Sequence, residues 1–372
     1  NPTHGPLHSA RAKFEERHGN IDAARDVLRD AVESYPSATL WSSWGKLEER
    51  QGNLITAAEL YEKGARSGAG RDDTSYLWHS LGSVLLQQRQ LPRALDAFNE
   101  GLRRTPSSSP LLLGAAVVLG QQGQFEQARA KFLAAVQADV SHAHAWRAWG
   151  TMEARMGNID VARDLFSRGL RRCPEHPALW TASAKLESEA GRADRARQLF
   201  RDGVEKCGQH AALLVAWAYF EMHQGKIQRA EQMLAHAGQQ VDGHRAGASV
   251  GEMYHVRALL NLKMGRPLEA RTAVDEGLVA APTHAPLYRV LGAMQDLAGD
   301  VEGARASFTE GLRLNPGYAQ LYHAYAKMEG KLANWGALNE LNAKAKAAFP
   351  MPEQPNMVAG PDDAPLRGLG SA

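Results

Sequence analysis

Cysteine is scarce in this sequence, and long hydrophobic runs are missing. The 372 residues include two cysteines, Cys173 and Cys207, at equivalent points of adjacent repeats. Their spacing excludes a disulfide framework and a cysteine-rich metal site, and it fits a reducing compartment. No apolar stretch reaches the ~20 residues that cross a bilayer, so no membrane insertion is expected. Because the chain opens Asn1-Pro2 without an apolar leader, we expect it to be a segment of a longer product.

An excess of one charge and the common catalytic motifs are also missing. Lysine and arginine number 43 against 41 acidic residues, a net charge of +2, so a nucleic-acid site would have to be a local stripe. We find no phosphate-binding glycine loop, nucleophile elbow or catalytic carboxylate pair. The histidines, among them His142, His144 and His176, show no metal-ligand spacing. The sequence therefore predicts no enzyme, no cofactor and no metal.

A repeat of about 34 residues dominates what is present. One glycine recurs with this spacing, an alanine follows it by five residues, and a small residue precedes it by seven. Glycine reaches left-handed backbone angles and so predicts a turn between two helices. The small residues predict a close helix crossing, and a proline ends the second helix. The turn position is occupied by Gly19, Gly52, Arg89, Gly123, Gly157, Gly191, Gly225, Gly265, Gly299 and Ala333.

Ten such hairpins predict an all-α fold, a right-handed superhelical solenoid over residues 1–349. The repeat spacing lengthens at two places, so enlarged loops are expected near residues 67–75 and 239–250. Residues 350–372 are rich in proline, glycine and aspartate and have no periodicity. They predict a flexible C-terminal tail.

The pattern resembles tetratricopeptide repeats over nearly the whole chain. Trp41-x-x-Trp44-x-x-x-Glu48 is similar to the half-a-tetratricopeptide (HAT) variant, which carries glutamate where tetratricopeptide repeats usually carry tyrosine. Gly-Asn-Ile-Asp-x-Ala-Arg, at Gly19 and Gly157, resembles chloroplast HAT factors that protect and help translate photosystem II transcripts. The resemblance implies a factor in the chloroplast stroma that binds single-stranded RNA for mRNA 5′-end protection, processing and translation. The alternative is a protein–protein scaffold, for example in a nuclear RNA-processing complex.

The glutamate position has an arginine counterpart in the second helix. We expect the two to pair across the turn of one hairpin, since guanidinium and carboxylate match in geometry. Leu85 and Leu95 replace both members in the third repeat, which favours a structural contact over a ligand site. The expected pairs are Glu15 with Arg25, Glu153 with Arg163 and Glu187 with Arg197.

The first helices of such hairpins are expected to line the concave face. Their remaining positions carry basic residues and one exposed tyrosine, which suit single-stranded RNA through phosphate neutralisation and base stacking. Glu16, Glu49, Glu189 and Asp296 interrupt this set, and a solvated face or a groove for an acidic peptide is the alternative. The basic lane, our candidate RNA site, comprises Lys13, Arg17, Lys46, Arg50, Arg147, Arg155, Lys185, Tyr219, Lys263, Arg289, Lys327 and Lys331.

Overall fold

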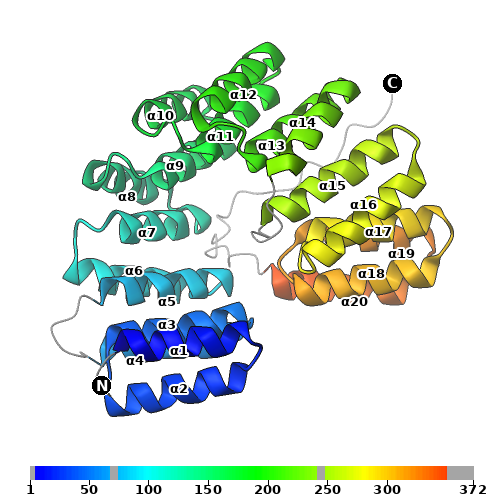
Figure 1. Ribbon diagram of the computed structural model, residues 1–372. Helices are drawn as coiled ribbons and strands as arrows, with labels where there is room; N and C mark the ends of the chain where they lie inside the picture. The colour runs from blue at the N-terminus through cyan, green and yellow to red at the C-terminus, as the bar shows by residue number, and fades with distance from the viewer. Residues whose placement is uncertain (1–4, 68–73, 241–247, 350–372) are drawn as a thin grey trace, which may run out of the picture. The chain divides into compact units, whose positions relative to one another are not determined.

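The computed structural model describes residues 5–67, 74–240 and 248–349. The chain consists of two compact units, residues 1–242 and 243–372. Within the described ranges the secondary structure is twenty α-helices and no strand (Figure 1). The helices pair as successive antiparallel hairpins, seven in the first unit and three in the second. The all-α class and the ten hairpins are therefore confirmed.

Each hairpin of the first unit has a first and a second helix of similar length. The first helices are α1 (Gly5–Arg17), α3 (Ala38–Arg50), α5 (Ser75–Gln87), α7 (Ser109–Gln121), α9 (Ala143–Arg155), α11 (Pro177–Glu189) and α13 (Ala211–His223). The second helices are α2 (Ile21–Ser34), α4 (Leu54–Arg66), α6 (Leu91–Arg104), α8 (Phe125–Ala138), α10 (Ile159–Arg172), α12 (Ala193–Cys207) and α14 (Ile227–Gln240).

The second unit repeats the same plan. Its first helices are α15 (Ala248–Lys263), α17 (Ala285–Leu297) and α19 (Ala319–Lys331). Its second helices are α16 (Pro267–Ala280), α18 (Val301–Leu314) and α20 (Trp335–Ala348). The expected tail, residues 350–372, lies outside the described residues, as does most of the two expected loops. α14 continues to Gln240 and α15 begins at Ala248, so the second connection is shorter than residues 239–250.

The turn inside each hairpin uses a left-handed residue, as the sequence predicts. The eight glycines at this position have φ between 71° and 81°. Arg89 and Ala333, which replace glycine in two repeats, also have positive φ, of 58° and 54°. The alanines five residues later are fully buried in nine repeats, because there the second helix crosses the first.

Glycine in a first helix marks the closest crossing. A Cβ added to Gly150 would lie 2.5 Å from Cε1 of Phe166 on the paired second helix. Phe166 is 2% exposed, so its ring fills the space that the missing side chain leaves. The small residue of α9 and the aromatic ring of α10 are thus two sides of one contact in the core of this hairpin.

The two helix layers differ in how they contact one another. Neighbouring first helices touch within each unit, as α9 touches α11 and α15 touches α17. Among the described helices of each unit, no second helix touches another second helix. Each contacts the first helix of its own hairpin and the first helix of the next hairpin in the same unit, where there is one. Each unit therefore curves with its first helices on the inner side, which is where the basic lane was predicted.

Candidate functional site

The arginine and glutamate positions do pair, but between hairpins. Arg129 of α8 donates two 2.8 Å hydrogen bonds to Glu153 of α9. Nε of Arg163 lies 2.6 Å from Glu187. The expected partners within one hairpin are therefore wrong. The observed pairs are Arg25 with Glu48, Arg129 with Glu153, Arg163 with Glu187, Arg197 with Glu221 and Arg305 with Glu329.

The reason is the direction of the arginine side chain. Each arginine follows the alanine that packs on its own first helix, and one residue turns the side chain by about 100° around the helix. That rotation points the guanidinium to the next hairpin, which the second helix also contacts. Glu15 lies in the first repeat, and its carboxylate accepts a 3.0 Å hydrogen bond from Asn20 instead of one from Arg25.

The paired glutamates are buried at the junctions between repeats. The Glu153 side chain is 1% exposed and also accepts hydrogen bonds from Trp149, at 3.2 Å, and Asn158, at 2.8 Å. The Arg129 guanidinium, supported by these donors, holds the pKa of Glu153 at about 2, against the opposing effect of burial. Such a satisfied carboxylate is a structural link between repeats and not an open ligand site.

The basic lane is less open than the sequence suggests. Arg50 forms two 2.6 Å hydrogen bonds with Glu16. Lys331 lies 2.9 Å from Asp296, and Lys185 lies 3.8 Å from Glu189. The acidic residues that interrupt the lane in sequence therefore neutralise part of it in space.

The other members of the lane differ in exposure. Arg147 and Arg289 are half-buried, and the Nε atom of each is buried without a hydrogen-bond partner among the described residues. Tyr219 is 41% exposed, and its ring centroid lies 4.4 Å from that of His223. Five members of the lane are exposed and form no ion pair among the described residues, namely Lys13, Arg17, Lys46, Arg155 and Lys327. Lys263 is exposed as well.

A groove of about 280 Å³ lies between α1 and α3 on the first-helix side of the first unit. Its apolar lining includes the buried Leu28 and Leu47. Lys13 and Lys46 lie on its rim, and neither has an acidic partner within 4 Å among the described residues. Because the Glu16–Arg50 pair is neutral, these two lysines leave a local charge of about +2. The groove is smaller than typical small-molecule pockets.

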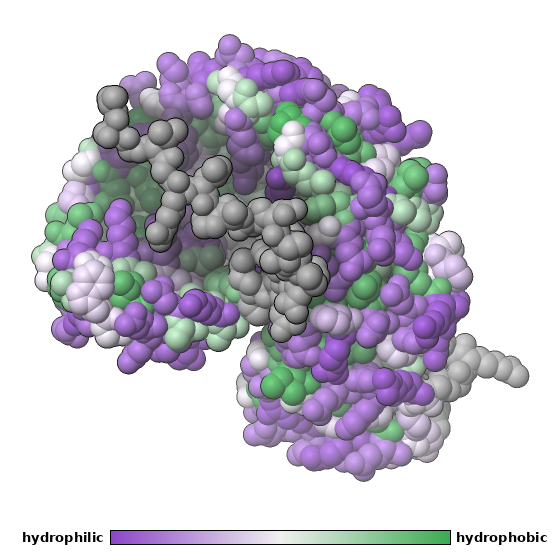
Figure 2. Space-filling model, turned by 180° about the vertical axis from the view of Figure 1, so that it is seen from behind, coloured by the Kyte–Doolittle hydropathy of each residue, from purple (hydrophilic) through white to green (hydrophobic). Residues whose placement is uncertain are grey.

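The visible face in Figure 2 is mostly hydrophilic, with hydrophobic side chains in scattered spots. Large apolar residues that are well exposed include Leu268, at 80%, Val279, at 84%, and Trp335, at 65%. No described helix is long and apolar enough to cross a bilayer.

Sequence reasoning missed one cluster in the second unit. Glu252 and His255 of α15 lie beside His284, the residue that precedes α17. A signal was present, because an i, i+3 carboxylate–histidine pair lies on one helix face. The third member depends on how closely two first helices approach, which the sequence does not state.

Comparisons with known proteins agree with the repeat pattern. One family model described as Tetratricopeptide repeat matches residues 143–186. A second with the same description matches residues 10–74, 44–109 and 255–319. Together they cover more than half of the chain. No curated protein matches.

Solved structures with similar folds have low sequence identity. A tetratricopeptide repeat protein from Parabacteroides merdae is 19% identical over 63% of this chain and 92% of its own, with a TM-score of 0.47. Pseudomonas aeruginosa pilF is 15% identical over 56% and 92%, with a TM-score of 0.41. A chain of the APC/C hetero-tetramer Cut9–Hcn1 is 12% identical over 93% and 88%, with a TM-score of 0.45. At such identities, these proteins' partners are not transferable to this chain.

Proposed function

Because the chain is a tetratricopeptide-like repeat protein, we propose that it is a non-enzymatic scaffold that holds an extended acidic segment of a partner protein against its first helices. The observation that carries this proposal is the groove between α1 and α3, at which Lys13 and Lys46 have no acidic partner among the described residues. Successive side chains of an extended peptide point to opposite sides. Alternating apolar and acidic residues would therefore place apolar side chains against the lining of the groove and carboxylates near Lys13 and Lys46.

The neutralised part of the basic lane favours a peptide over RNA. Single-stranded RNA carries one phosphate per nucleotide, so its affinity depends on many cations along the strand. Arg50, Lys185 and Lys331 already contact carboxylates, and a phosphate would have to compete with these pairs. A short acidic peptide needs only the two lysines of the groove.

Single-stranded RNA remains the second candidate, in the form of an organellar mRNA factor of the chloroplast stroma. The observation that favours it is the exposed ring of Tyr219, which lies on the first-helix layer of the first unit, as the exposed cation Arg155 does. Bases stack on such rings with about 1–3 kcal/mol each. Arg17 and Lys263 would add phosphate contacts.

Fluorescence anisotropy separates the two candidates. The probes are a labelled eight-residue peptide of alternating aspartate and leucine and a labelled single-stranded RNA of eight nucleotides. We expect saturable peptide binding that Lys13→Glu with Lys46→Glu weakens by tenfold or more. The charge-matched control, Lys63→Glu with Lys131→Glu, changes lysines of two second helices and should bind as the wild type does.

The RNA titration supplies the opposing outcome. Tight RNA binding, with log K falling by about 0.7 per phosphate contact as log salt rises, would overturn the peptide proposal in favour of RNA if the acidic peptide does not bind. Equal loss of peptide binding in both double variants would mean that the groove is not the site.

A further inference from the structure

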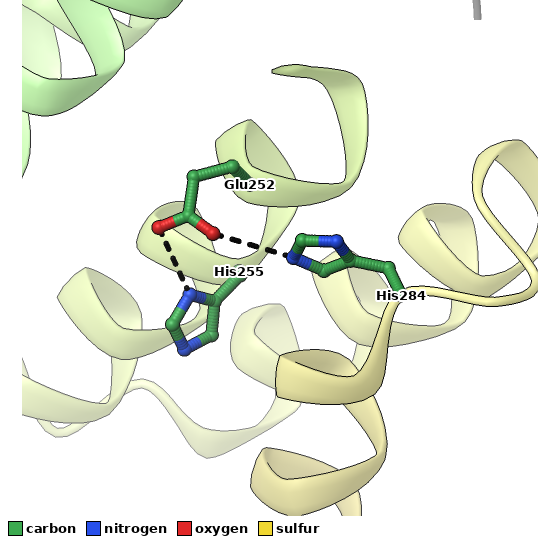
Figure 3. Close-up of side chains that lie close together, drawn as sticks. All are labelled: Glu252, His255 and His284. Carbon is green, nitrogen blue, oxygen red and sulfur yellow. Dashed lines mark hydrogen bonds and ion pairs between the residues drawn. The ribbon is translucent and has the colours of Figure 1, made fainter. Parts of the chain in front are cut away.

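Two histidines and one glutamate converge between α15 and α17 of the second unit (Figure 3). Glu252 and His255 lie one turn apart on α15, and His284 is the N-cap residue of α17. One carboxylate oxygen of Glu252 lies 3.4 Å from Nδ1 of His255, and the other lies 3.3 Å from Nε2 of His284. All three side chains thus offer a metal-ligating atom to the same small space.

The backbone is shaped to bring His284 there. A Cβ at residue 251 would lie 2.5 Å from Cγ of His284, so any residue other than glycine would collide with the imidazole ring. Gly251 is buried in the first turn of α15, directly before Glu252. The absence of its side chain therefore sets the approach of the histidine to the carboxylate.

Hydrogen bonding accounts for His255, whose Nδ1 lies within hydrogen-bond distance of Glu252 at 3.4 Å, but it does not account for His284. Hydrogen bonds between a charged nitrogen and a carboxylate are about 2.7–2.9 Å long, which is shorter than both contacts. Nε2 of His284 is fully buried and has no hydrogen-bond partner among the described residues. Its 3.3 Å approach to Glu252 therefore lacks hydrogen-bond geometry, and a buried nitrogen is left with an unused lone pair or proton.

The spacing and the donor types fit a divalent transition-metal ion. With metal–ligand bonds of about 2.0–2.2 Å, the ligands of a tetrahedral ion lie about 3.3–3.5 Å apart. Each histidine nitrogen lies at this distance from a different oxygen of the Glu252 carboxylate. One ligand atom from each of the three residues can be chosen so that all three lie within 4.8 Å of one another. Imidazole nitrogen and carboxylate oxygen are ligands of zinc, and three protein ligands with one open position form a known coordination class.

We propose that Glu252, His255 and His284 bind a divalent transition-metal ion of the zinc type, which links α15 to α17. The side chains of His255 and His284 are 8% and 16% exposed, so packing holds both imidazole rings in place. Glu252 is 43% exposed and leaves an entry path for the ion. The fourth position faces that path and takes water or a side chain of a partner.

Arg289 opposes the ion and offers a diagnostic. Its Nη2 lies 3.3 Å from Nε2 of His255. When a metal binds Nδ1 of His255, the imidazole proton is on Nε2. This N–H then faces the N–H groups and the positive charge of the Arg289 guanidinium. Removing that guanidinium should therefore tighten metal binding.

The first unit contains a matched control cluster at the same repeat positions. His144 occupies the place of Glu252, Arg147 that of His255, and His176 that of His284. The rings of His144 and His176 lie 4.9 Å apart between centroids. Among the described residues, no carboxylate lies close enough to both to complete a three-ligand group with them. This cluster should bind the ion far more weakly.

The test is titration of the full chain, free of any affinity tag, with Zn²⁺ by calorimetry and with Co²⁺ by visible absorption. We expect one site. Loss of one ligand in His255→Ala, His284→Ala or Glu252→Gln should weaken binding at least about 100-fold, since even outer partners of metal ligands contribute 10–100-fold. His144→Ala should keep wild-type affinity, and Arg289→Met should bind several-fold more tightly.

Circular dichroism of the metal-free variants is the control for folding. Each variant should keep the wild-type helix content, so that a loss of metal binding does not reflect unfolding. The tetrahedral absorption of Co²⁺ should be present in the wild type and absent in Glu252→Gln. No saturable site in the wild type, binding that survives all three ligand substitutions, or weaker binding in Arg289→Met would each overturn the proposal.

Discussion

The guanidinium of Arg129 holds the carboxylate of Glu153 in the next hairpin through two parallel hydrogen bonds, both 2.8 Å long. The same link recurs at Arg25 with Glu48 and at Arg305 with Glu329. A planar pair of this kind fixes distance and orientation together. It therefore sets how one hairpin stacks on the next, in addition to the apolar contacts of the helices.

The pair should be replaceable only as a whole. Arg129→Leu leaves a buried carboxylate without its cation, and we expect it to lower the free energy of unfolding by about 3–5 kcal/mol. Adding Glu153→Leu should recover at least half of that loss. Leu119, at the glutamate position of another repeat, packs in a cluster that Leu95 contacts. Urea denaturation followed by circular dichroism measures both variants, and a double variant no more stable than Arg129→Leu contradicts this account.

Acid should weaken the same link. The pKa of Glu153 is lowered to about 2 in the folded chain, against about 4.3 in an unfolded one. Its contribution is therefore complete above pH ~4.3 and is lost as the pH falls toward 2. Glu153→Gln should reduce the fall in denaturation midpoint between pH 5 and pH 2.5. Glu126→Gln, at a side chain that is 86% exposed, should keep more of the wild-type pH dependence.

The sequence contained the correct pairing of these positions. If the positions paired within one hairpin, Arg129 would face Leu119 and Glu48 would face Ala58, and neither combination is an ion pair. If they pair with the next hairpin, Leu95 faces Leu119 and Arg129 faces Glu153. A contact between repeats therefore explains why leucine replaces both members together at Leu95 and Leu119.

Other features lay beyond the sequence for physical reasons. Helix periodicity predicts which face carries Lys46 and Arg50. It does not predict that Arg50 pairs with Glu16 while Lys46 has no acidic partner in the described part of the chain. The distance between neighbouring repeats decides which carboxylate a long flexible side chain such as Arg50 reaches. The approach of His284 to Glu252 likewise depends on the spacing of α15 and α17, which only the structure supplies.

Replacing a left-handed alanine by glycine should stabilise the second unit. Ala333 is exposed and has φ of 54°, a conformation that costs about 1–2 kcal/mol for a residue with a Cβ. Part of the gain is offset by the greater entropy of glycine in the unfolded chain. We expect Ala333→Gly to raise the free energy of unfolding by about 0.5–1 kcal/mol. Ala343→Gly, at an exposed helical position of α20, should lower it by about 1 kcal/mol; equal effects would exclude backbone strain as the cause.

A methyl group at a close helix crossing should act in the opposite sense to one on an open helix face. In Gly150→Ala the new Cβ meets the Phe166 ring at 2.5 Å, and overpacking of this kind costs about 1–3 kcal/mol. In Gly330→Ala the new Cβ meets nothing within 4 Å, so the better helix propensity of alanine should stabilise by up to about 1 kcal/mol. Thermal unfolding separates the two, and adding Phe166→Leu to Gly150→Ala should cost less than the two single changes combined. If Gly150→Ala stabilised as Gly330→Ala does, the crossing would be wider than its side chains indicate, and glycine there would serve no packing role.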